Sequence, residues 1–314
     1  MTSFINSVDQ RTKLAGTNRL EVLLFSLGVD LATGRKEVFG INVFKVREVM
    51  HVPDITHAPD MPDSVEGMVS LRGSMVPIIN LAKFCGVHGE EKPKILMVTE
   101  YNKHVQGFLV DSVETIERLS WDEVKTPPPM MSSRLGGLVT GVAELPDKRL
   151  VMIMDVEKVL AETAHFYDQE QLFDTIQPYQ KREVQGLFAD DSSVARKQIS
   201  TTLDRMQIKY IATVNGAEAW SRLKAIAEQA EAAGQQVIDV LQFVLTDVEM
   251  PEMDGYVLTQ KINSDPRFKG VPVLMHSSLT ADANQLLGKE MGVDAYVPKF
   301  EPNELSNVLA RVLG

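Results

Sequence analysis

Hydrophobic positions follow two different patterns in the two halves of the chain. In the first half, short aliphatic and β-branched runs alternate with polar, glycine or proline turns, a pattern that predicts β-strands. The predicted strands are Leu20–Leu27, Phe39–Val46, Lys94–Thr99, Val105–Val113 and Leu150–Val156, and short helical pieces are predicted at Lys45–Met50 and Val156–Glu162. Many short strands separated by turns favour an all-β barrel or sandwich.

From Val184 onward, strand-like and helix-like patterns alternate. The predicted strands are Val184–Ala189, Ile208–Thr213, Val240–Leu245, Val271–Met275 and Ala295–Val297; the predicted helices are Val194–Met206, Ala217–Ala232, Tyr256–Ser264, Ala281–Met291 and Glu304–Val312. Five strand–helix units predict an α/β domain with a five-stranded parallel sheet and helices on both faces. In such sheets the functional groups lie beyond the carboxyl ends of the strands.

The change of pattern predicts two domains, residues 1–165 and 184–314, joined by a linker at 166–183. Polar residues dominate the linker, although Leu172, Phe173 and Ile176 form an apolar edge. Pro178 prevents one continuous helix through it. A length of 314 residues agrees with two domains.

The chain carries a net charge of −11, and both halves are acidic. This charge disfavours nucleic acid or anionic lipid as the main partner, because such binding depends on Lys and Arg. The single cysteine, Cys85, cannot form an internal disulfide, so we expect a reducing compartment and a structural thiol. No apolar run approaches about 18 residues, so we expect a cytoplasmic protein with no direct membrane insertion.

Acidic residues follow two of the predicted parallel strands. Asp190 and Asp191 end the first strand, and Asp247 ends the third. Adjacent strands lie about 4.8 Å apart, so neighbouring strands would crowd these carboxylates around a divalent cation. An all-oxygen site favours Mg²⁺. The plainer alternative is that Asp190 and Asp191 only cap a helix.

Two further strand ends carry groups suited to phosphoryl transfer. Ser277 ends the fourth strand and Lys299 follows the fifth. The plainer alternatives are an ordinary turn hydroxyl for Ser277 and a solvated surface charge for Lys299. A carboxylate such as Asp247 can accept a phosphoryl group as a nucleophile. A lysine, a hydroxyl and Mg²⁺ together stabilise the charge on the transferring oxygens.

These residues resemble the response-regulator receiver family across Val184 to Gly314, and the D-x-x-M-P-x-M-D-G stretch from Asp247 to Gly255 is the most specific part. The resemblance implies a flavodoxin-like fold with Asp247 as the phosphoacceptor and Lys299 as the active-site lysine. It further implies a switch formed by Ser277 and Tyr296, and Mg²⁺ held by Asp190, Asp191, Asp247 and the backbone carbonyl of Glu249.

One position departs from that family, in which Pro usually follows the lysine through a cis peptide bond. Here Phe300 follows Lys299. A cis bond before a residue other than Pro costs about 2.5–4 kcal/mol. We therefore expect the lysine loop to differ from the family's usual conformation.

In the first half, the segment Ser64–Leu81 reads as a strand–turn–strand unit in which Gly67 and Gly73 permit tight turns and Arg72 lies at a turn. Its G-x-x-x-L-R-G-x-x-x-P-I-x-x-L pattern resembles the CheW-like coupling family, over about Leu20 to Glu162. The resemblance implies two small SH3-like β-barrels sharing a core, with no catalytic site. It also implies docking surfaces for a chemotaxis histidine kinase and for chemoreceptors, with Val46, Glu48 and Arg72 at contact positions. Arg72 as plain surface charge and Val46 as core packing are the alternatives.

A coupling domain followed by a receiver resembles the CheV-type chemotaxis proteins. This resemblance implies a non-enzymatic adaptor in receptor–kinase arrays that is regulated by phosphorylation of Asp247. The nearest alternative is a phosphate sink with constant coupling, which an Asp247→Ala variant in arrays would separate from a regulator. A transcriptional regulator is disfavoured because no basic helix-turn-helix segment follows. A phosphatase would show multiple turnovers.

Overall fold

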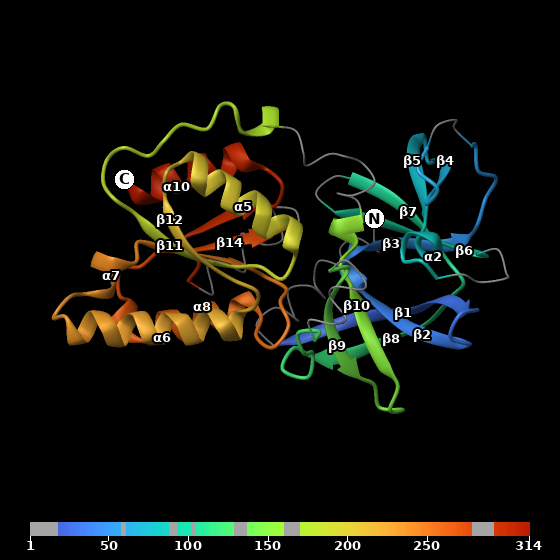
Figure 1. Cartoon of the computed structure of the whole chain (residues 1–314), viewed down its shortest axis with the longest axis horizontal. Helices are drawn as coiled ribbons and strands as arrows, with labels where there is room; N and C mark the ends of the chain where they lie inside the picture. Colours follow the sequence, from blue (N-terminus) through green and yellow to red (C-terminus); the bar gives the residue numbers. More distant parts are fainter. Residues whose placement is uncertain are drawn as a thin grey trace. The chain divides into compact units, whose positions relative to one another are not determined.

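The computed structural model describes residues 18–57, 61–87, 93–101, 104–128, 137–159, 170–277 and 292–314. The chain divides into two compact units: Leu20–Ala164 form the unit called here N-terminal, and the unit called here C-terminal contains His165–Gly314. The N-terminal unit contains β-sheets, and the C-terminal unit contains a sheet with helices (Figure 1). No helix in the described ranges is both long and apolar enough to cross a membrane.

The N-terminal unit contains two mixed five-stranded sheets in its described part. The first sheet has the order β8-β1-β2-β10-β9 and the second the order β3-β6-β7-β5-β4. The strands are β1 (Arg19–Asp30), β2 (Arg35–Asn42), β3 (Val46–His51), β4 (Val65–Leu71), β5 (Ser74–Asn80), β6 (Ile95–Tyr101), β7 (His104–Val110), β8 (Ser112–Ser120), β9 (Val139–Glu144) and β10 (Leu150–Met154). The short helices η1 (Val43–Lys45) and α2 (Leu81–Phe84) follow β2 and β5.

Each sheet is closed by the segment that follows one of its edge strands. Beyond β3, Thr56 forms an antiparallel bridge with Met68 of β4, the opposite edge of the second sheet. Beyond β8, Lys125 forms the same kind of bridge with Val142 of β9 in the first sheet. Closure removes exposed sheet edges, and it supports the predicted pair of small barrels.

Alternation along the strands gives each barrel its own core and a third core between the barrels. In β1, Val22 and Leu24 face the interior of the first barrel, whereas Leu23 and Phe25 belong to the cluster between the barrels. The shared cluster also contains Met97 and Phe108 from the second sheet. A period of two residues places successive side chains on opposite faces, so both faces of these strands are apolar.

Several sequence predictions for this unit were wrong in detail. The stretch Lys45–Met50 is not helical, because Val46–His51 pairs as β3 with β6 and only Val43–Lys45 forms a helical turn. The predicted strand Val105–Val113 is two strands that meet at Asp111, and β8 and β9 were not predicted. The predicted helix Val156–Glu162 is helical over its described residues, 156–159.

The sequence predicted a tight turn at Gly67, but this glycine lies inside β4, beside an irregularity in the β4–β5 pairing. Its φ is +136°, and a Cβ there would lie 2.2 Å from the carbonyl oxygen of Thr56. The closing bridge between Thr56 and Met68 therefore passes directly over Gly67. Gly73, with a φ of +86°, does occupy a turn, together with Arg72.

The described part of the C-terminal unit has a five-stranded parallel sheet in the order β12-β11-β13-β14-β15. Its strands are β11 (Gln185–Ala189), β12 (Lys209–Thr213), β13 (Phe243–Asp247), β14 (Val273–Ser277) and β15 (Ala295–Pro298). Its helices are η2 (Glu170–Phe173), α5 (Ser193–Arg205), α6 (Gly216–Ala232), α7 (Val237–Val240), α8 (Gly255–Ser264), η3 (Pro266–Phe268) and α10 (Pro302–Leu313). The predicted helix at Ala281–Met291 lies outside the described residues, and α7 was not predicted.

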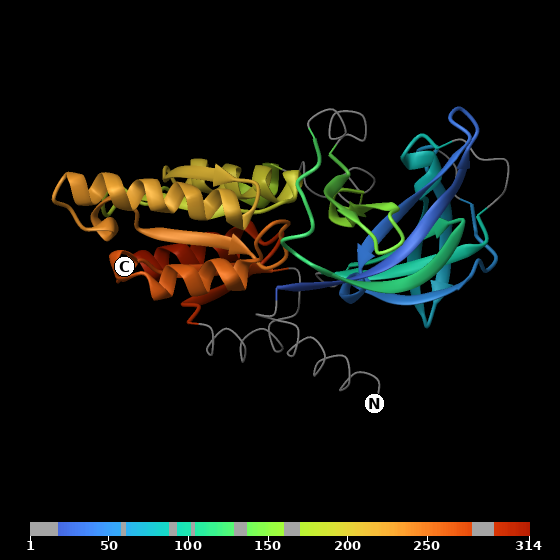
Figure 2. The ribbon, with the colours of Figure 1, turned by 90° about the horizontal axis from the view of Figure 1, so that it is seen from below.

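Helices cover both faces of this parallel sheet, as the sequence predicted (Figure 2). One apolar layer joins the sheet to α5 and α10, and the other joins it to α6 and α8. Phe188 and Leu245 point into the first layer, and Leu187 and Val244 point into the second. Phe173 and Ile176, from the predicted linker, are also buried in the first layer.

We predict that Gly67→Ala destabilises the N-terminal unit by at least about 2 kcal/mol, because the new methyl group meets the Thr56 carbonyl and the positive φ adds strain. Gly34→Ala is the matched control, because Gly34 has a φ of +66° with no atom within 4 Å of the added Cβ. The control should cost only about 1 kcal/mol. Thermal unfolding of both variants checks this, and equal losses would contradict the close approach.

Candidate functional site

The site of the C-terminal unit is a row of polar side chains that continues one apolar layer of the sheet. The layer contains Phe188, Leu245, Leu274 and Val297, one from each of four neighbouring strands. Two residues beyond these on each strand come Asp190, Asp247, His276 and Lys299. Because side chains two apart on a strand share a face, the apolar layer ends in four polar groups at the carboxyl edge.

Three carboxylates meet at this edge. Oxygen atoms of Asp190, Asp191 and Asp247 lie within 4.8 Å of one another. Asp190 and Asp247 are buried, and Asp191 is half-buried. Closely spaced oxygen donors that are partly open to solvent suit Mg²⁺, which keeps several waters when it binds protein. The predicted acidic group is therefore consistent with a Mg²⁺ site.

Lys299 lies among these carboxylates. Its Nζ is 2.9 Å from Oδ2 of Asp247 and 3.2 Å from Oδ2 of Asp190, and the lysine is only 2% exposed. A buried ammonium is tolerated only when it is paired and hydrogen-bonded. Phe300 follows with a φ of +63°, and no described peptide bond is cis. Phe300 in place of Pro is thus compatible with a lysine that reaches the carboxylate of Asp247.

Backbone groups hold the two key carboxylates in place. The amide of Val248 donates to Oδ1 of Asp247 at 2.7 Å, and the amide of Ser192 donates to Oδ1 of Asp190 at 2.9 Å. Arg196 of α5 donates to the carbonyl oxygens of Asp190 and Asp191, each at 2.8 Å. The two bonds from Arg196 fix the loop after β11 to α5, the helix that follows it.

The last residue of the D-x-x-M-P-x-M-D-G stretch has a steric role. A Cβ on Gly255 would lie 2.0 Å from the carbonyl oxygen of Asp247. Its amide donates to the carbonyl of Val248 at 2.9 Å. Asp254 caps α8 by accepting from the amide of Val257 at 2.7 Å. The motif therefore folds the start of α8 tightly against the end of β13.

The remaining predicted residues lie around this edge. Ser277 is buried at the end of β14, and its carbonyl accepts from the amide of Lys299 at 3.0 Å. Tyr296 is half-buried beside Tyr256 and Met275, and burial raises the pKa of the Tyr296 hydroxyl. Glu249 is half-buried, two residues after Asp247.

In the N-terminal unit, the structure brings together two of the three predicted contact residues. A guanidinium nitrogen of Arg72 lies 2.8 Å from Oε2 of Glu48, with the Arg72 side chain 70% exposed and the Glu48 side chain 19% exposed. Val46 instead packs at the edge of the core shared by the barrels. An irregularity in the β3–β6 pairing between Val46 and Glu48 separates their environments.

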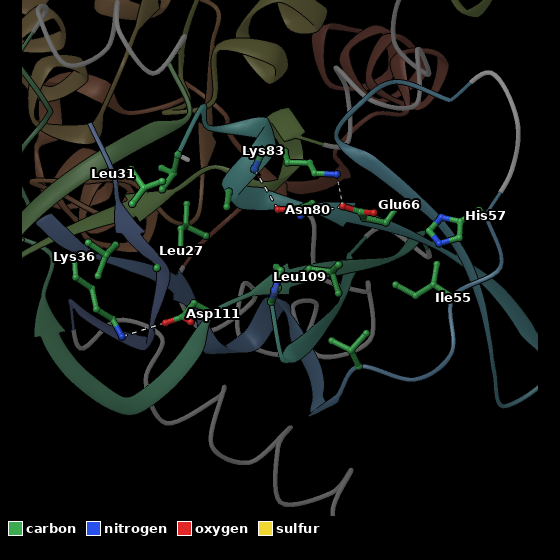
Figure 3. A pocket seen from close by; sticks show the side chains of 16 residues that line it. Leu27, Leu31, Lys36, Ile55, His57, Glu66, Asn80, Lys83, Leu109 and Asp111 are labelled. Carbon is green, nitrogen blue, oxygen red and sulfur yellow. Dashed lines mark hydrogen bonds and ion pairs between the residues drawn. The ribbon is translucent and has the colours of Figure 1, made fainter. Parts of the chain in front are cut away.

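A cleft in the N-terminal unit was not predicted from the sequence. Its volume is about 990 Å³, and Leu27 and Leu109 are among the residues that line it. An ion pair lies on each side, Lys36 with Asp111 at 3.1 Å and Lys83 with Glu66 at 2.7 Å (Figure 3). Each pair lowers the pKa of its carboxylate against the raising effect of burial. No sequence motif marks this cleft, because its walls come from strands far apart in the chain.

Sequence reasoning also missed supporting residues of the site, namely His276, Arg196 and Tyr256. His276 directly follows a predicted strand, but no motif or spacing in the sequence marks a histidine at that position as functional. Arg196 acts through its contacts with backbone carbonyls, which no pattern of residue types reveals.

Comparisons with known proteins agree with this two-part organisation. The model of the CheW-like domain matches residues 21–164, and that of the response regulator receiver domain matches residues 187–310. Chemotaxis protein CheV3 of Helicobacter pylori is 32% identical over 280 residues, covering 88% of each chain. Chemotaxis protein CheV1 of the same species is 24% identical over 334 residues, covering 100% of this chain and 99% of that protein. Chemotaxis protein CheW of Klebsiella aerogenes is 32% identical over 154 residues, covering 48% of this chain and 87% of that protein.

Asp254 generates a prediction about pH. Burial raises its pKa from 3.8 to about 6, so the folded state binds this proton more tightly than the unfolded state. Stability should therefore fall as pH rises from about 4 to 6, by roughly 3 kcal/mol for this group, and then level off. Asp254→Asn keeps a capping oxygen and should remove that part of the pH dependence. Denaturant unfolding between pH 4 and 7 checks this, and parallel curves for both proteins would contradict it.

Proposed function

This chain belongs to the CheV family of chemotaxis proteins, and we propose that it is an adaptor whose coupling activity is regulated by phosphorylation of Asp247. Members of this family are adaptors and not enzymes. The N-terminal unit is the CheW-like coupling domain, and the C-terminal unit is the receiver. The observation that carries the proposal is the buried Lys299 ammonium, 2.9 Å from the Asp247 carboxylate beside two further carboxylates.

The proposed reaction moves a phosphoryl group from a phosphohistidine of the kinase to Asp247. The P–N bond breaks, a P–O bond to a carboxylate oxygen of Asp247 forms, and the released imidazole nitrogen takes up a proton. Lys299 already contacts Oδ2 of Asp247 and would offset the charge that the phosphoryl oxygens bring. Residues Asp190, Asp191, Asp247 and the carbonyl of Glu249 would hold Mg²⁺, which supplies further charge compensation.

We propose that phosphorylation is read out at the end of β14 and β15. Ser277 would bond the new phosphoryl group, and Tyr296 would change its packing against Tyr256 and Met275. Phosphorylation can shift a receiver between two conformations only if each has different contacts with the phosphoryl group. A backbone hydrogen bond from the amide of Lys299 to the carbonyl of Ser277 joins the two residues, so a displacement of either residue would shift the other.

We propose that the coupling domain binds a chemotaxis histidine kinase and chemoreceptors, and that this binding recruits the protein to membrane-associated receptor arrays. The exposed Arg72 and its partner Glu48 form the surface that supports this proposal. Arg72 has a φ of +50° in the turn between β4 and β5, so a rigid hairpin presents it. Val46 lies at the edge of the shared core and would contribute apolar contact.

We predict Mg²⁺-dependent transfer of labelled phosphate from a chemotaxis histidine kinase to the wild type and none to Asp247→Asn, because an amide oxygen is a poor nucleophile. Asp204→Asn, at an exposed position on α5, is the matched control and should be labelled like the wild type. Gel autoradiography of the kinase and adaptor bands measures the transfer. Labelling of Asp247→Asn at the wild-type rate would refute the assignment.

We predict that Arg72→Glu weakens binding of the kinase at least tenfold while thermal stability stays within about 1 kcal/mol, because an exposed ion pair contributes little to folding. Lys148→Glu is the control, since Lys148 forms an exposed pair with Glu144 in the other barrel. Calorimetric titration of the kinase measures both variants. An equal loss for Lys148→Glu would show that overall charge, and not this surface, sets the affinity.

A further inference from the structure

His276 is the one member of the polar row that the proposed phosphorylation does not use. It lies on β14 directly opposite Asp247 in the strand register and is 2% exposed. Its position two residues after Leu274 directs its side chain to the face that carries Asp190 and Lys299. His276 therefore puts a hydrogen-bonding group at the position on β14 where the next side chain of the apolar layer would otherwise lie.

The side chain of His276 meets one particular carboxylate. Its Nδ1 is 3.5 Å from Oδ2 of Asp190, the same oxygen that Lys299 approaches at 3.2 Å. The other oxygen of Asp190 accepts from the amide of Ser192. Asp190 is fully buried, so its charge depends on these neighbours, because a buried carboxylate is costly unless it is paired.

Lys299 has two tasks that compete. It contacts both Asp190 and Asp247, and a phosphoryl group on Asp247 would draw the ammonium toward the new negative oxygens. Asp190 would then lose part of the charge compensation that its Oδ2 receives. His276 stays anchored on β14 and remains beside that oxygen.

We propose that His276 is a positioning residue that donates from Nδ1 to Asp190 and holds this carboxylate in place for the metal while Lys299 engages the phosphoryl group. The proposal rests on the proposed function, since it concerns the same site. The donor is available whether the imidazole is neutral, as the Nδ1–H tautomer, or protonated. Groups that orient a metal-binding side chain typically change metal affinity 10–100-fold when they are removed.

The first test measures metal binding by the full-length protein, with Mn²⁺ as a probe and the free ion counted by electron paramagnetic resonance. We expect His276→Leu to weaken Mn²⁺ binding at least tenfold. We expect His276→Asn, whose amide can donate from nearly the same place, to stay within about threefold of the wild type. Addition of beryllofluoride, which mimics the acyl phosphate, should enlarge the difference between the two variants in Mn²⁺ binding.

Leu274→Val is the matched control, because it disturbs packing in the same column of side chains without touching the polar row. It should lower the unfolding temperature and leave Mn²⁺ affinity unchanged. The proposal is overturned if His276→Leu binds Mn²⁺ like the wild type, or if His276→Asn is as weak as His276→Leu. A wild type that binds no Mn²⁺ would instead contradict the metal site of the proposed function, and with it this inference.

A second measurement observes the ring of His276 directly in the wild-type protein. In protein labelled with ¹⁵N-histidine, long-range proton–nitrogen spectra report which ring nitrogen of His276 carries a proton, with assignment by the missing signal in His276→Asn. We expect a proton on Nδ1 both in the free protein and with Mg²⁺ and beryllofluoride bound. A deprotonated Nδ1 in either state would overturn the proposal even if the leucine variant fails to fold.

Discussion

Mutual repulsion of three carboxylates is the constraint on which the C-terminal unit depends. Charges within 4.8 Å of one another repel by roughly 3.5 kcal/mol per pair at an effective dielectric constant of about 20. The Lys299 ammonium offsets part of this cost by touching Asp247 and Asp190 together. The remaining negative charge makes the site receptive to a divalent cation. Because its charges are not balanced, the arrangement of these side chains is sensitive to any further charged group that binds there.

The fold supplies the geometry that this balance requires. Apolar residues fill one face of four parallel strands, and the polar groups begin only where that layer ends. Gly255 lets α8 start against the Asp247 carbonyl, and Arg196 ties α5 to the loop that carries Asp190 and Asp191. Hydrophobic burial therefore sets the positions of the strands, and short-range bonds set the orientation of the carboxylates.

The sequence sufficed to predict the parallel sheet and the meeting of Asp190, Asp191 and Asp247, because strand ends converge by topology once the β–α alternation is recognised. The fine structure of the barrels was not predictable in the same way. Whether Val46 begins a strand depends on pairing with Thr99, a contact between segments far apart in the chain. The role of Gly67 depends on the passage of Thr56 over it. The proposed role of His276 depends on its contact with Asp190, which no local sequence pattern predicts.

The two units use ion pairs in opposite ways. The Arg72 side chain is 70% exposed while it contacts Glu48, so water screens the pair and separating its two charges costs little. Lys299 is 2% exposed, so removing its partners would leave a buried charge unpaired, which is far more costly. The exposed pair is thus suited to exchange Glu48 for a group on the proposed protein partner. The buried pair can change only when a new charge is delivered directly to it, as the proposed phosphorylation of Asp247 would do.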